Sequence, residues 1–352
     1  MPAEWEPHHT TWLVWPHNRA DWDTKQSQAQ WCFVEIVRHL IRSERVSIIY
    51  RELNLRRQTE RRFALAGITT EKIDSYIMST NRSWIRDSGP IFVVSNHSGG
   101  RQVAITDWGF NGWARYRAYD LDNLLPRRIA DTLKMRRFVV RRTTGIDGDQ
   151  VVLEGGSVDV SGDGLLLTTE QCLLGKKQMR NKGMAREDLE SSLCEYLGTT
   201  SVCWLQGGIV GDDTNGHVDD VARFVGPRTV VAATVSDNTD ENYSTLSENI
   251  KRLSHFRDGA GRQLDVIDVP MPRPLRFNGM RLPASYMNFF VGNSVVLVPT
   301  FNDPTDQIAL SILSDCFKDR EVIGIYSGDL ILGLGALHCL TQQQPKGAIT
   351  AN

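Results

Sequence analysis

Residues 218–233 read VDDVARFVGPRTVVAA, which is two β-rich runs joined by a Gly-Pro pair. Both runs, Val218–Val225 and Thr229–Ala233, are rich in valine, and a Gly-Pro pair between such runs is typical of a hairpin connection. A helical pattern begins near Asp240, and another β-rich run follows at Leu264–Val269. The stretch therefore predicts a unit made of strand, strand, helix and strand.

The same order of elements recurs along the chain. Helical patterns begin near Asp23, Leu121, Met184, Asp240 and Asp303. The β-rich runs that follow them are Val46–Tyr50, Phe138–Arg141, Ser201–Trp204, Leu264–Val269 and Glu321–Ile325. The unit spans about 55 to 70 residues in the later part of the chain, a period typical of repeat folds. Because one unit cannot bury both faces of its sheet, we expect five units closed in a ring.

The division into domains follows from this repeat. A charged helix expected within 50–67 interrupts the first unit, but no Gly/Ser-rich or Pro-rich linker divides the chain. We therefore expect one α/β domain over residues 1–345. The tail 346–352 has no periodicity, and we expect it to fray.

Composition limits the classes of function. The 352 residues include 40 basic and 42 acidic side chains, a net charge of −2, which argues against a general nucleic-acid binder. No apolar run approaches the roughly 18 residues of a membrane span, and residues 1–7 lack the pattern of a signal peptide. The six cysteines form no CxxC pair, so free thiols in a reducing cytoplasm are expected.

Four polar segments fall at predicted strand ends or in adjacent loops. They are 84–90 (WIRDSGP), 154–156 (EGG), 215–219 (NGHVD) and 335–345 (GALHCLTQQQP). Strand ends would converge on one axis of a closed ring, so these segments could share a pocket. Together they supply a thiol, an imidazole and three carboxylates. That set suits chemistry on a cationic, planar group such as a guanidinium.

Cys339 is the candidate nucleophile. Most cysteines are small buried hydrophobes, and the other five lie within apolar helical or strand patterns: Cys32, Cys172, Cys194, Cys203 and Cys316. Cys339 instead follows the turn Gly333-Leu334-Gly335 and precedes a run of Thr and Gln. This polar, tightly turned context predicts an exposed thiolate.

His217 and Asp219 stand two residues apart on a predicted strand, so their side chains would share one face. The pair on its own allows three interpretations: a structural histidine, two metal ligands, or a catalytic group. A metal site needs three or four ligands at recognisable spacing, and the remaining histidines form no HxxxH or HExxH pattern. We therefore expect no metal.

Glu154 and Asp87 carry weaker signals. Glu154 closes a predicted strand at Val151–Leu153 and precedes two glycines, which allow a close approach of the backbone to a ligand. Asp87 follows Arg86, and the plainest interpretation of that pair is a surface salt bridge beside a turn.

With these segments in this order, the chain closely resembles the agmatine deiminase family, relatives of the Porphyromonas-type peptidylarginine deiminases within the guanidino-group-modifying enzymes. The resemblance covers nearly the whole chain. It includes 1–8 (MPAEWEPH), 84–90, 107–113 (DWGFNGW), 214–219 and 337–343 (LHCLTQQ). It implies a fivefold pseudosymmetric α/β propeller of strand-strand-helix-strand units, which agrees with the repeat described above.

The resemblance also implies a reaction and roles for residues at matching positions. The reaction is hydrolysis of agmatine to N-carbamoylputrescine and ammonia through a cysteine thiouronium intermediate, a step of putrescine biosynthesis that needs no metal or organic cofactor. The implied roles are Cys339 as nucleophile, His217 as general acid and base, Asp87 and Asp219 as the guanidinium clamp, Glu154 as the residue that orients the histidine with substrate in reach, and Trp84 as a pocket wall.

Other functions stay open at this point. The family commonly has Gly-Gly-Gly-Asn where 333–336 read GLGA, and Gly-Gly where Ala114 and Arg115 stand, so another guanidine, peptidyl or free arginine, is an alternative substrate. An amidinotransferase or a non-catalytic binder of cations would use a similar pocket. We expect Arg86 to point away from the substrate, and Arg115 to be the loop arginine that could reach a substrate carboxylate. The expected partner is a small cationic guanidine, and assembly into a homo-oligomer is compatible with the sequence.

Overall fold

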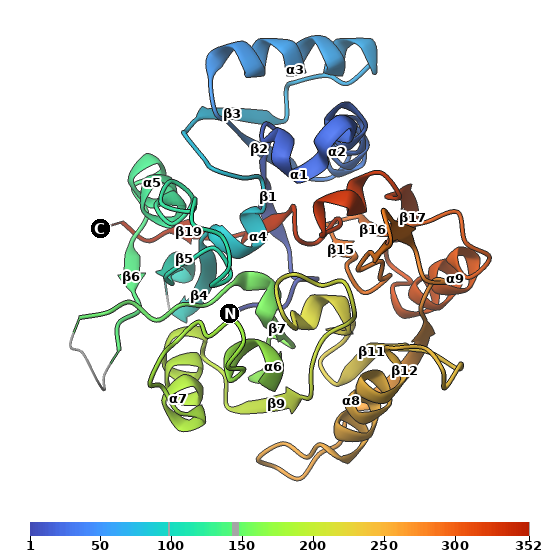
Figure 1. Ribbon diagram of the computed structural model, residues 1–352. Coiled ribbons are helices and arrows are strands. Elements are labelled where there is room, and N and C mark those ends of the chain that lie inside the picture. The colour runs from blue at the N-terminus through green and yellow to red at the C-terminus, as the bar shows by residue number, and fades with distance from the viewer. Residues whose placement is uncertain (98, 143–147, 352) are drawn as a thin grey trace.

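The computed structural model describes residues 1–97, 99–142 and 148–351, which form a mixed α/β fold. Small sheets surround the middle of the molecule, and the longer helices lie on the outside (Figure 1). The outer helices are α2 (Gln26–Leu40), α3 (Leu53–Leu65), α5 (Leu125–Leu133), α7 (Arg186–Leu197), α8 (Tyr243–His255) and α9 (Asp306–Cys316).

The stretch that begins at residue 218 forms the predicted unit with shifted bounds. Strand β10 (Ala222–Phe224) pairs antiparallel with β11 (Thr229–Thr234), and β12 (Asp265–Pro270) pairs parallel with β11 after α8. Residues Val218–Asp220 form the 3₁₀ turn η3 rather than the start of the strand. Helix α8 begins later than expected because the Asp240 carboxylate accepts the backbone N–H of residue 242 and ends the preceding loop.

Four other sheets repeat this order. Their elements are β7 (Asp159–Val160), β8 (Leu165–Thr169), α7 and β9 (Ser201–Leu205); β15 (Phe290–Val291), β16 (Val295–Thr300), α9 and β17 (Glu321–Tyr326); β4 (Ile91–His97), β5 (Gly100–Asp107), α5 and β6 (Arg137–Val139); and β18 (Gln342–Pro345), β1 (His8–Val14), α2 and β2 (Arg45–Tyr50). In each, the first pair is antiparallel and the second parallel. Strand β3 (Ile73–Ile77) follows helix α3 and pairs parallel with β2, which adds a fourth strand to the last sheet. Across the residues described, strand pairing does not join these sheets into one closed sheet.

The two ends of the chain meet in one sheet. Strand β18 near the C-terminus pairs with β1 near the N-terminus, and Thr11 stands opposite Gln343. The prediction of a frayed tail is wrong for 346–351, since β19 (Ala348–Ile349) pairs parallel with β5. The backbone groups of the tail find partners along that edge; for example, the Thr350 N–H donates to the Val103 carbonyl over 3.0 Å. Asn352 lies outside the described residues.

Short elements connect these units and hold the polar segments. They are α1 (Arg19–Trp22), α4 (Ile85–Ser88), α6 (Glu170–Leu173), the 3₁₀ turns η1 (Asp23–Lys25), η2 (Gly155–Ser157), η3 and η4 (Leu330–Gly333), and the hairpin β13 (Arg276–Phe277) with β14 (Met280–Arg281). Turn η2 contacts both α4 and η3. The polar segments therefore meet through short turns, which lie between the sheets.

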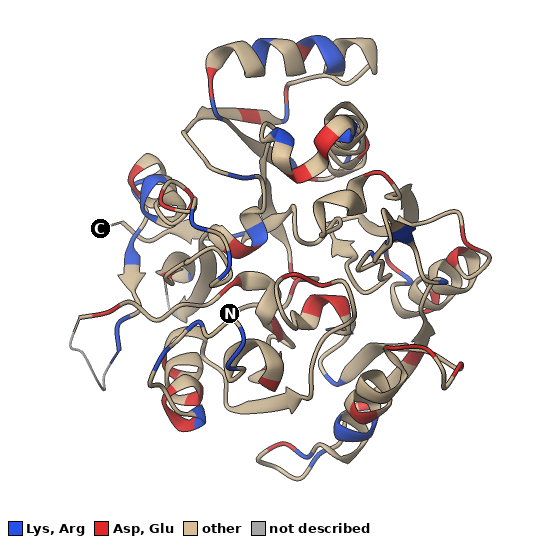
Figure 2. Ribbon diagram, viewed as in Figure 1, with Lys and Arg blue, Asp and Glu red and all other residues tan. Residues whose placement is uncertain are grey.

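Apolar side chains fill the space between each sheet and its helix. Leu246 and Leu253 of α8, for example, are buried in one cluster with Val231 of β11. Charged residues of both signs lie along the outer helices, and further acidic and basic residues gather near the middle of the molecule (Figure 2). Over the three described ranges, no helix is both long enough and apolar enough to cross a membrane.

Candidate active site

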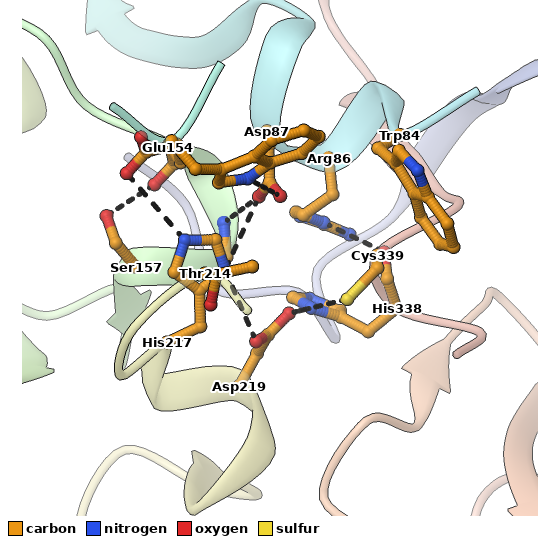
Figure 3. A network of polar contacts seen from close by, with 12 residues as sticks. Trp84, Arg86, Asp87, Glu154, Ser157, Thr214, His217, Asp219, His338 and Cys339 are labelled. Carbon is orange, nitrogen blue, oxygen red and sulfur yellow. Dashed lines mark hydrogen bonds and ion pairs between the residues drawn. The ribbon is translucent and has the colours of Figure 1, made fainter. Parts of the chain in front are cut away.

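The polar segments that are far apart in sequence meet in one place (Figure 3). Asp87 lies in α4 and Asp219 lies in η3, and Glu154 is the residue directly before η2. His217 directly precedes η3, and Cys339 lies shortly before β18. Trp84 and the five candidate residues are all buried, with exposed fractions of 5% or less. The structure thus brings together every residue that the sequence nominated for the site.

Gly156 marks the point where the side chains converge. A Cβ atom built on it would lie 2.6 Å from His217 Nδ1, 2.8 Å from Asp87 Oδ1 and 3.0 Å from Asp219 Oδ2. The backbone N–H of Gly156 donates to Asp87 Oδ1 over 3.0 Å. Only glycine allows this close approach, and this explains why the second residue after Glu154 is a glycine.

Asp87 is a buried carboxylate among like charges. Its Oδ2 accepts the indole N–H of Trp113 over 2.9 Å, and Trp113 was no candidate of the sequence analysis. Burial raises the pKa of Asp87 to about 6, with smaller upward contributions from Asp219 and Glu154 and a downward one from His217. The interpretation of Arg86-Asp87 as a surface salt bridge is wrong, because both side chains are buried.

His217 stands among three carboxylates. Its Nδ1 lies 3.7 Å from Asp87 Oδ1 and 3.9 Å from Asp219 Oδ1, and its Nε2 lies 3.7 Å from Glu154 Oε2. Burial alone would lower the pKa of His217, but Asp87, Cys172 and Glu154 together raise it well above its usual value. The predicted strand for the His-x-Asp pair is wrong. The turn η3, rather than strand alternation, brings the two side chains together.

An arginine that the sequence analysis did not name keeps Glu154 ionised. Its Oε1 accepts Arg180 Nε over 3.0 Å, and both side chains are fully buried. Burial opposes ionisation, yet Arg180 and His217 lower the pKa of Glu154 to about 2. Nothing in the pattern around Arg180 distinguished it from a surface cation. The strand predicted at Val151–Leu153 is also wrong, because that segment forms only an isolated bridge from Val152 to Gly109.

Asp219 is hydrogen-bonded to the residue before the candidate nucleophile. His338 Nδ1 lies 2.7 Å from Asp219 Oδ2, and His338 Nε2 lies 2.8 Å from Glu4 Oε2. Arg86 NH2 lies 3.3 Å from the same Glu4 oxygen, so Arg86 faces this network rather than the cavity, as predicted. The sequence analysis gave His338 and Glu4 no role, since neither belongs to a recognisable spacing.

Cys339 is not the exposed thiolate that its sequence context predicted. Its exposed fraction is 5%; its Sγ accepts Asn288 Nδ2 over 3.1 Å and donates to Asp219 Oδ2 over 3.6 Å. Burial raises the pKa of the Cys339 thiol well above its usual value, and Asp219, Asp220 and Asp87 raise it further. The raised pKa favours the protonated thiol over the thiolate.

A cavity opens onto these groups. Trp84, Asp87, Trp113 and Cys339 line it, so Trp84 forms part of its wall as expected. A Cβ on Gly335 would lie 2.7 Å from Trp84 Cζ3, which explains why the turn before Cys339 needs glycine there. At this end the cavity thus presents the thiol of Cys339, the carboxylate of Asp87 and the two indole rings.

The same cavity is lined by a second polar group, the Asp213 cluster, made of Asp21, Arg82, Tyr116 and Asp213. Tyr116 OH donates to Asp213 Oδ2 over 2.5 Å, and the Arg82 guanidinium lies 4.2 Å from the centre of the Tyr116 ring. Arg82 also forms an ion pair with Asp21. Arg115 is exposed, and its guanidinium lies 5.5 Å from the Tyr116 ring centre.

One set of side chains could supply metal ligands. Glu154, Cys172 and His217 have ligand atoms that all lie within 4.8 Å of one another. Cys172 is buried, as its apolar pattern predicted, but it lies against His217 rather than only in the core. Zinc would need all three atoms at roughly 2.0–2.3 Å from the ion, and the Arg180 guanidinium beside Glu154 repels a cation. The absence of a metal stays a prediction.

The chain is similar to known proteins over nearly its whole length. Residues 1–345 match the model of the Porphyromonas-type peptidyl-arginine deiminase family. The chain is 35% identical to the agmatine deiminase of Stutzerimonas stutzeri over 369 residues, which cover 98% of this chain and 95% of that protein. The agmatine deiminase of Pseudomonas aeruginosa is likewise 35% identical, over 98% of this chain and 95% of its own.

Solved structures give the same result. The agmatine deiminase of Enterococcus faecalis superposes with a TM-score of 0.87 at 31% identity, over 98% of this chain and 95% of that one. A substrate-bound agmatine deiminase of C. jejuni superposes with a TM-score of 0.85 at 27% identity, over 99% and 96%. The chain therefore belongs to the Porphyromonas-type peptidyl-arginine deiminase family.

Proposed function

We propose that this protein hydrolyses agmatine to N-carbamoylputrescine and ammonia. The observation that carries the proposal is the convergence of Cys339, His217 and the carboxylates of Asp87, Glu154 and Asp219 at one buried point. Relatives at 35% identity over nearly the whole chain bear the name agmatine deiminase.

The carboxylates fit a guanidinium group. Asp219 Oδ1 and Glu154 Oε2 are buried and lack a hydrogen-bond partner among the described residues, so each can accept a substrate N–H. With Asp87, they would hold the planar cation by charge-assisted hydrogen bonds and place its carbon beside Cys339 Sγ. The positive charge of the substrate would offset the carboxylates that now raise the pKa of Cys339, so substrate binding itself promotes the thiolate.

The steps then follow from the groups present. The cationic substrate promotes loss of the Cys339 thiol proton to solvent, and the resulting thiolate attacks the guanidinium carbon and forms a tetrahedral adduct. Protonated His217 gives its proton to a departing nitrogen, the C–N bond breaks, and ammonia leaves a thiouronium on Cys339. Neutral His217 takes a proton from water as the water attacks the same carbon. The C–S bond breaks, the proton of the new hydroxyl group returns to the sulfur of Cys339, and the ureido product is released; no metal or organic cofactor takes part.

The residues around the far end of the substrate favour agmatine over arginine. Agmatine ends in an ammonium, and Asp213 in the same cavity offers a carboxylate whose partner is the neutral Tyr116 hydroxyl. Arginine would bring a carboxylate against Asp213, and an unpaired charge there is costly. Arg82 is already paired with Asp21, and Arg115 beside Tyr116 is a cation that could serve an arginine substrate.

A panel of guanidines tests this proposal. We expect ammonia and ureido product from agmatine, with kcat/KM well above that for free arginine and an arginine-containing peptide. Asp213→Asn should lower kcat/KM for agmatine, and Arg115→Ala should leave the preference unchanged. A preference for arginine or peptide that disappears in Arg115→Ala would instead establish the alternative, a deiminase of arginine. Product without ammonia release, in the presence of an acceptor amine, would indicate an amidinotransferase.

The wider arrangement also remains a proposal. We infer that the five strand-strand-helix-strand units form a fivefold pseudosymmetric α/β propeller over a single domain, residues 1–345. The repeated antiparallel and parallel pairs support this, as does their distribution around the middle of the molecule in Figure 1. Six free cysteines favour a cytoplasmic location. Assembly into a homo-oligomer stays a prediction that sedimentation would test.

A further inference from the structure

Glu4 belongs to the N-terminal segment, yet its side chain is buried beside the candidate site. Its Oε1 accepts the backbone N–H of Val291 over 2.8 Å, and Arg223 NH2 lies 3.0 Å from the same oxygen. Its Oε2 lies 2.8 Å from His338 Nε2 and 3.3 Å from Arg86 NH2. Burial alone would raise the pKa of Glu4, but Arg223, His338 and Arg86 hold it well below its usual value. The carboxylate is therefore ionised.

His338 is held between two carboxylates. Its Nδ1 lies 2.7 Å from Asp219 Oδ2 and its Nε2 lies 2.8 Å from Glu4 Oε2. Ionised carboxylates only accept hydrogen bonds, so each contact requires an N–H on the ring. With both carboxylates ionised, both ring nitrogens of His338 would donate, and the three residues form a Glu4–His338–Asp219 line.

The two oxygens of Asp219 have different partners. Oδ2 accepts His338 Nδ1 and the thiol of Cys339, whereas Oδ1 has no hydrogen-bond partner among the residues described and lies 3.9 Å from His217 Nδ1. The line therefore occupies one oxygen and leaves the other for a substrate N–H. It fixes the orientation of the carboxylate as well as its charge.

The charge of Asp219 depends on the cations around it. The charged or titratable groups that act on it are His338, His217, Arg223, Arg86, Asp87, Asp220 and Cys339. Burial opposes ionisation of Asp219, and His338 provides the strongest opposing effect, so the pKa of Asp219 ends below its usual value. Without the effect of His338, the pKa of Asp219 would rise, because the carboxylate is fully buried beside Asp87 and Asp220.

We propose that Glu4, acting through His338, is a positioning residue that keeps Asp219 ionised and oriented to hold the guanidinium. The N-terminal segment thereby becomes part of the site. The inference rests on the proposed function, because it assigns Asp219 to the clamp.

Variants of Glu4 and His338 test this role, and a variant of Glu6 is the control. Asp87 sets the acid limb of kcat/KM in the wild type. Glu4→Gln and His338→Asn should raise KM and move that limb to higher pH by about one unit, which is about a tenfold loss on the acid side. The limb moves because Asp219 would then take up a proton at a higher pH than Asp87 does. The double variant should lose no more than the worse single one, because both act on one line.

Glu6→Gln is the matched control, since Glu6 anchors the same segment through the Ala3 N–H and Arg101 instead. Glu4→Asp, which keeps the charge, should recover part of the loss.

The proposal is overturned if Glu4→Gln and Glu6→Gln have the same pH profile, or if Glu4→Gln loses activity equally at every pH. Thermal unfolding checks that each variant is folded. His338→Asn keeps a donor toward Asp219, so it serves as the second variant should Glu4→Gln unfold.

A measurement without substrate separates this inference from the proposed function. In protein labelled with ¹⁵N-histidine, the signal that His338→Asn removes should show both ring nitrogens protonated in the wild type and a neutral ring in Glu4→Gln. A neutral His338 ring in the wild type contradicts the line. An imidazolium signal in a wild type that does not hydrolyse agmatine supports the line and counts against the proposed function; the kinetic comparison then uses the guanidine that the panel identifies.

Discussion

The backbone N–H of Gly156 donates to Asp87 Oδ1 over 3.0 Å, and the missing side chain of Gly156 leaves the space in which His217 and Asp219 meet that carboxylate. We expect Gly156→Ala to lower kcat/KM by about 100-fold, because a displacement of about 1 Å at a reacting group has that effect. Steady-state kinetics would measure the loss. Gly226→Ala is the control, since a Cβ there would meet nothing closer than Thr229 Oγ1 at 3.6 Å. Equal activity in both variants would contradict the convergence at Gly156.

Cys339→Ser should abolish turnover and leave the fold intact, because it removes the thiol from a cavity and keeps a small polar side chain. Mass spectrometry of wild-type protein quenched during turnover should find an amidino adduct on Cys339. Cys316→Ser, at the end of α9, should retain activity. An adduct on another cysteine would refute the assignment of the nucleophile.

Removal of Arg180 should affect both stability and rate. Breaking a fully buried ion pair typically costs about 3–5 kcal/mol, because the remaining charge is left buried and unpaired. In Arg180→Met we expect Glu154 to take up a proton and His217 to lose a partner that raises its pKa, so Tm and kcat both fall. Arg186→Met breaks the half-buried pair with Glu170, which keeps Arg252 as a partner, and should change stability by no more than about 1 kcal/mol. Matching losses in the two variants would be inconsistent with this account.

The dependence of activity on pH should report Asp87. Its pKa is raised to about 6, so the carboxylate is ionised above that pH and takes up a proton as the pH falls through it. Protonation removes one charge of the clamp, and kcat/KM for agmatine should therefore fall on the acid side of about pH 6. A profile that stays flat well below that pH would mean that Asp87 is already ionised there or is not needed. Asp87→Asn should have low activity and no such limb.

Exhaustive chelation should leave activity unchanged, because the reaction proposed here uses only side chains of this chain. The side chains that could bind a metal ion are those of Glu154, Cys172 and His217. Metal analysis before and after dialysis against a chelator, with activity measured on the same samples, tests the point. A stoichiometric metal that is lost together with activity, and whose binding Cys172→Ala abolishes, would make these residues ligands and remove the proposed mechanism.

The sequence by itself determined the repeating unit and the identity of the reacting groups. Strand and helix periodicity are local properties, so the strand-strand-helix-strand order around Val218–Val225 was evident from composition and turns, although the bounds shifted by a few residues. The type and order of Cys339, His217, Glu154, Asp87 and Asp219 likewise stand in the chain itself.

Only the tertiary structure decided the environment of those groups. Burial and pairing depend on residues that are distant in sequence, so no local pattern could show that Arg180 neutralises Glu154 or that Glu4 reaches His338 across 334 positions. For the same reason the polar context of Cys339 predicted an exposed thiolate, whereas burial and three neighbouring carboxylates favour the protonated thiol. The charge state of a side chain is set by the dielectric and the charges around it, and the fold alone supplies both.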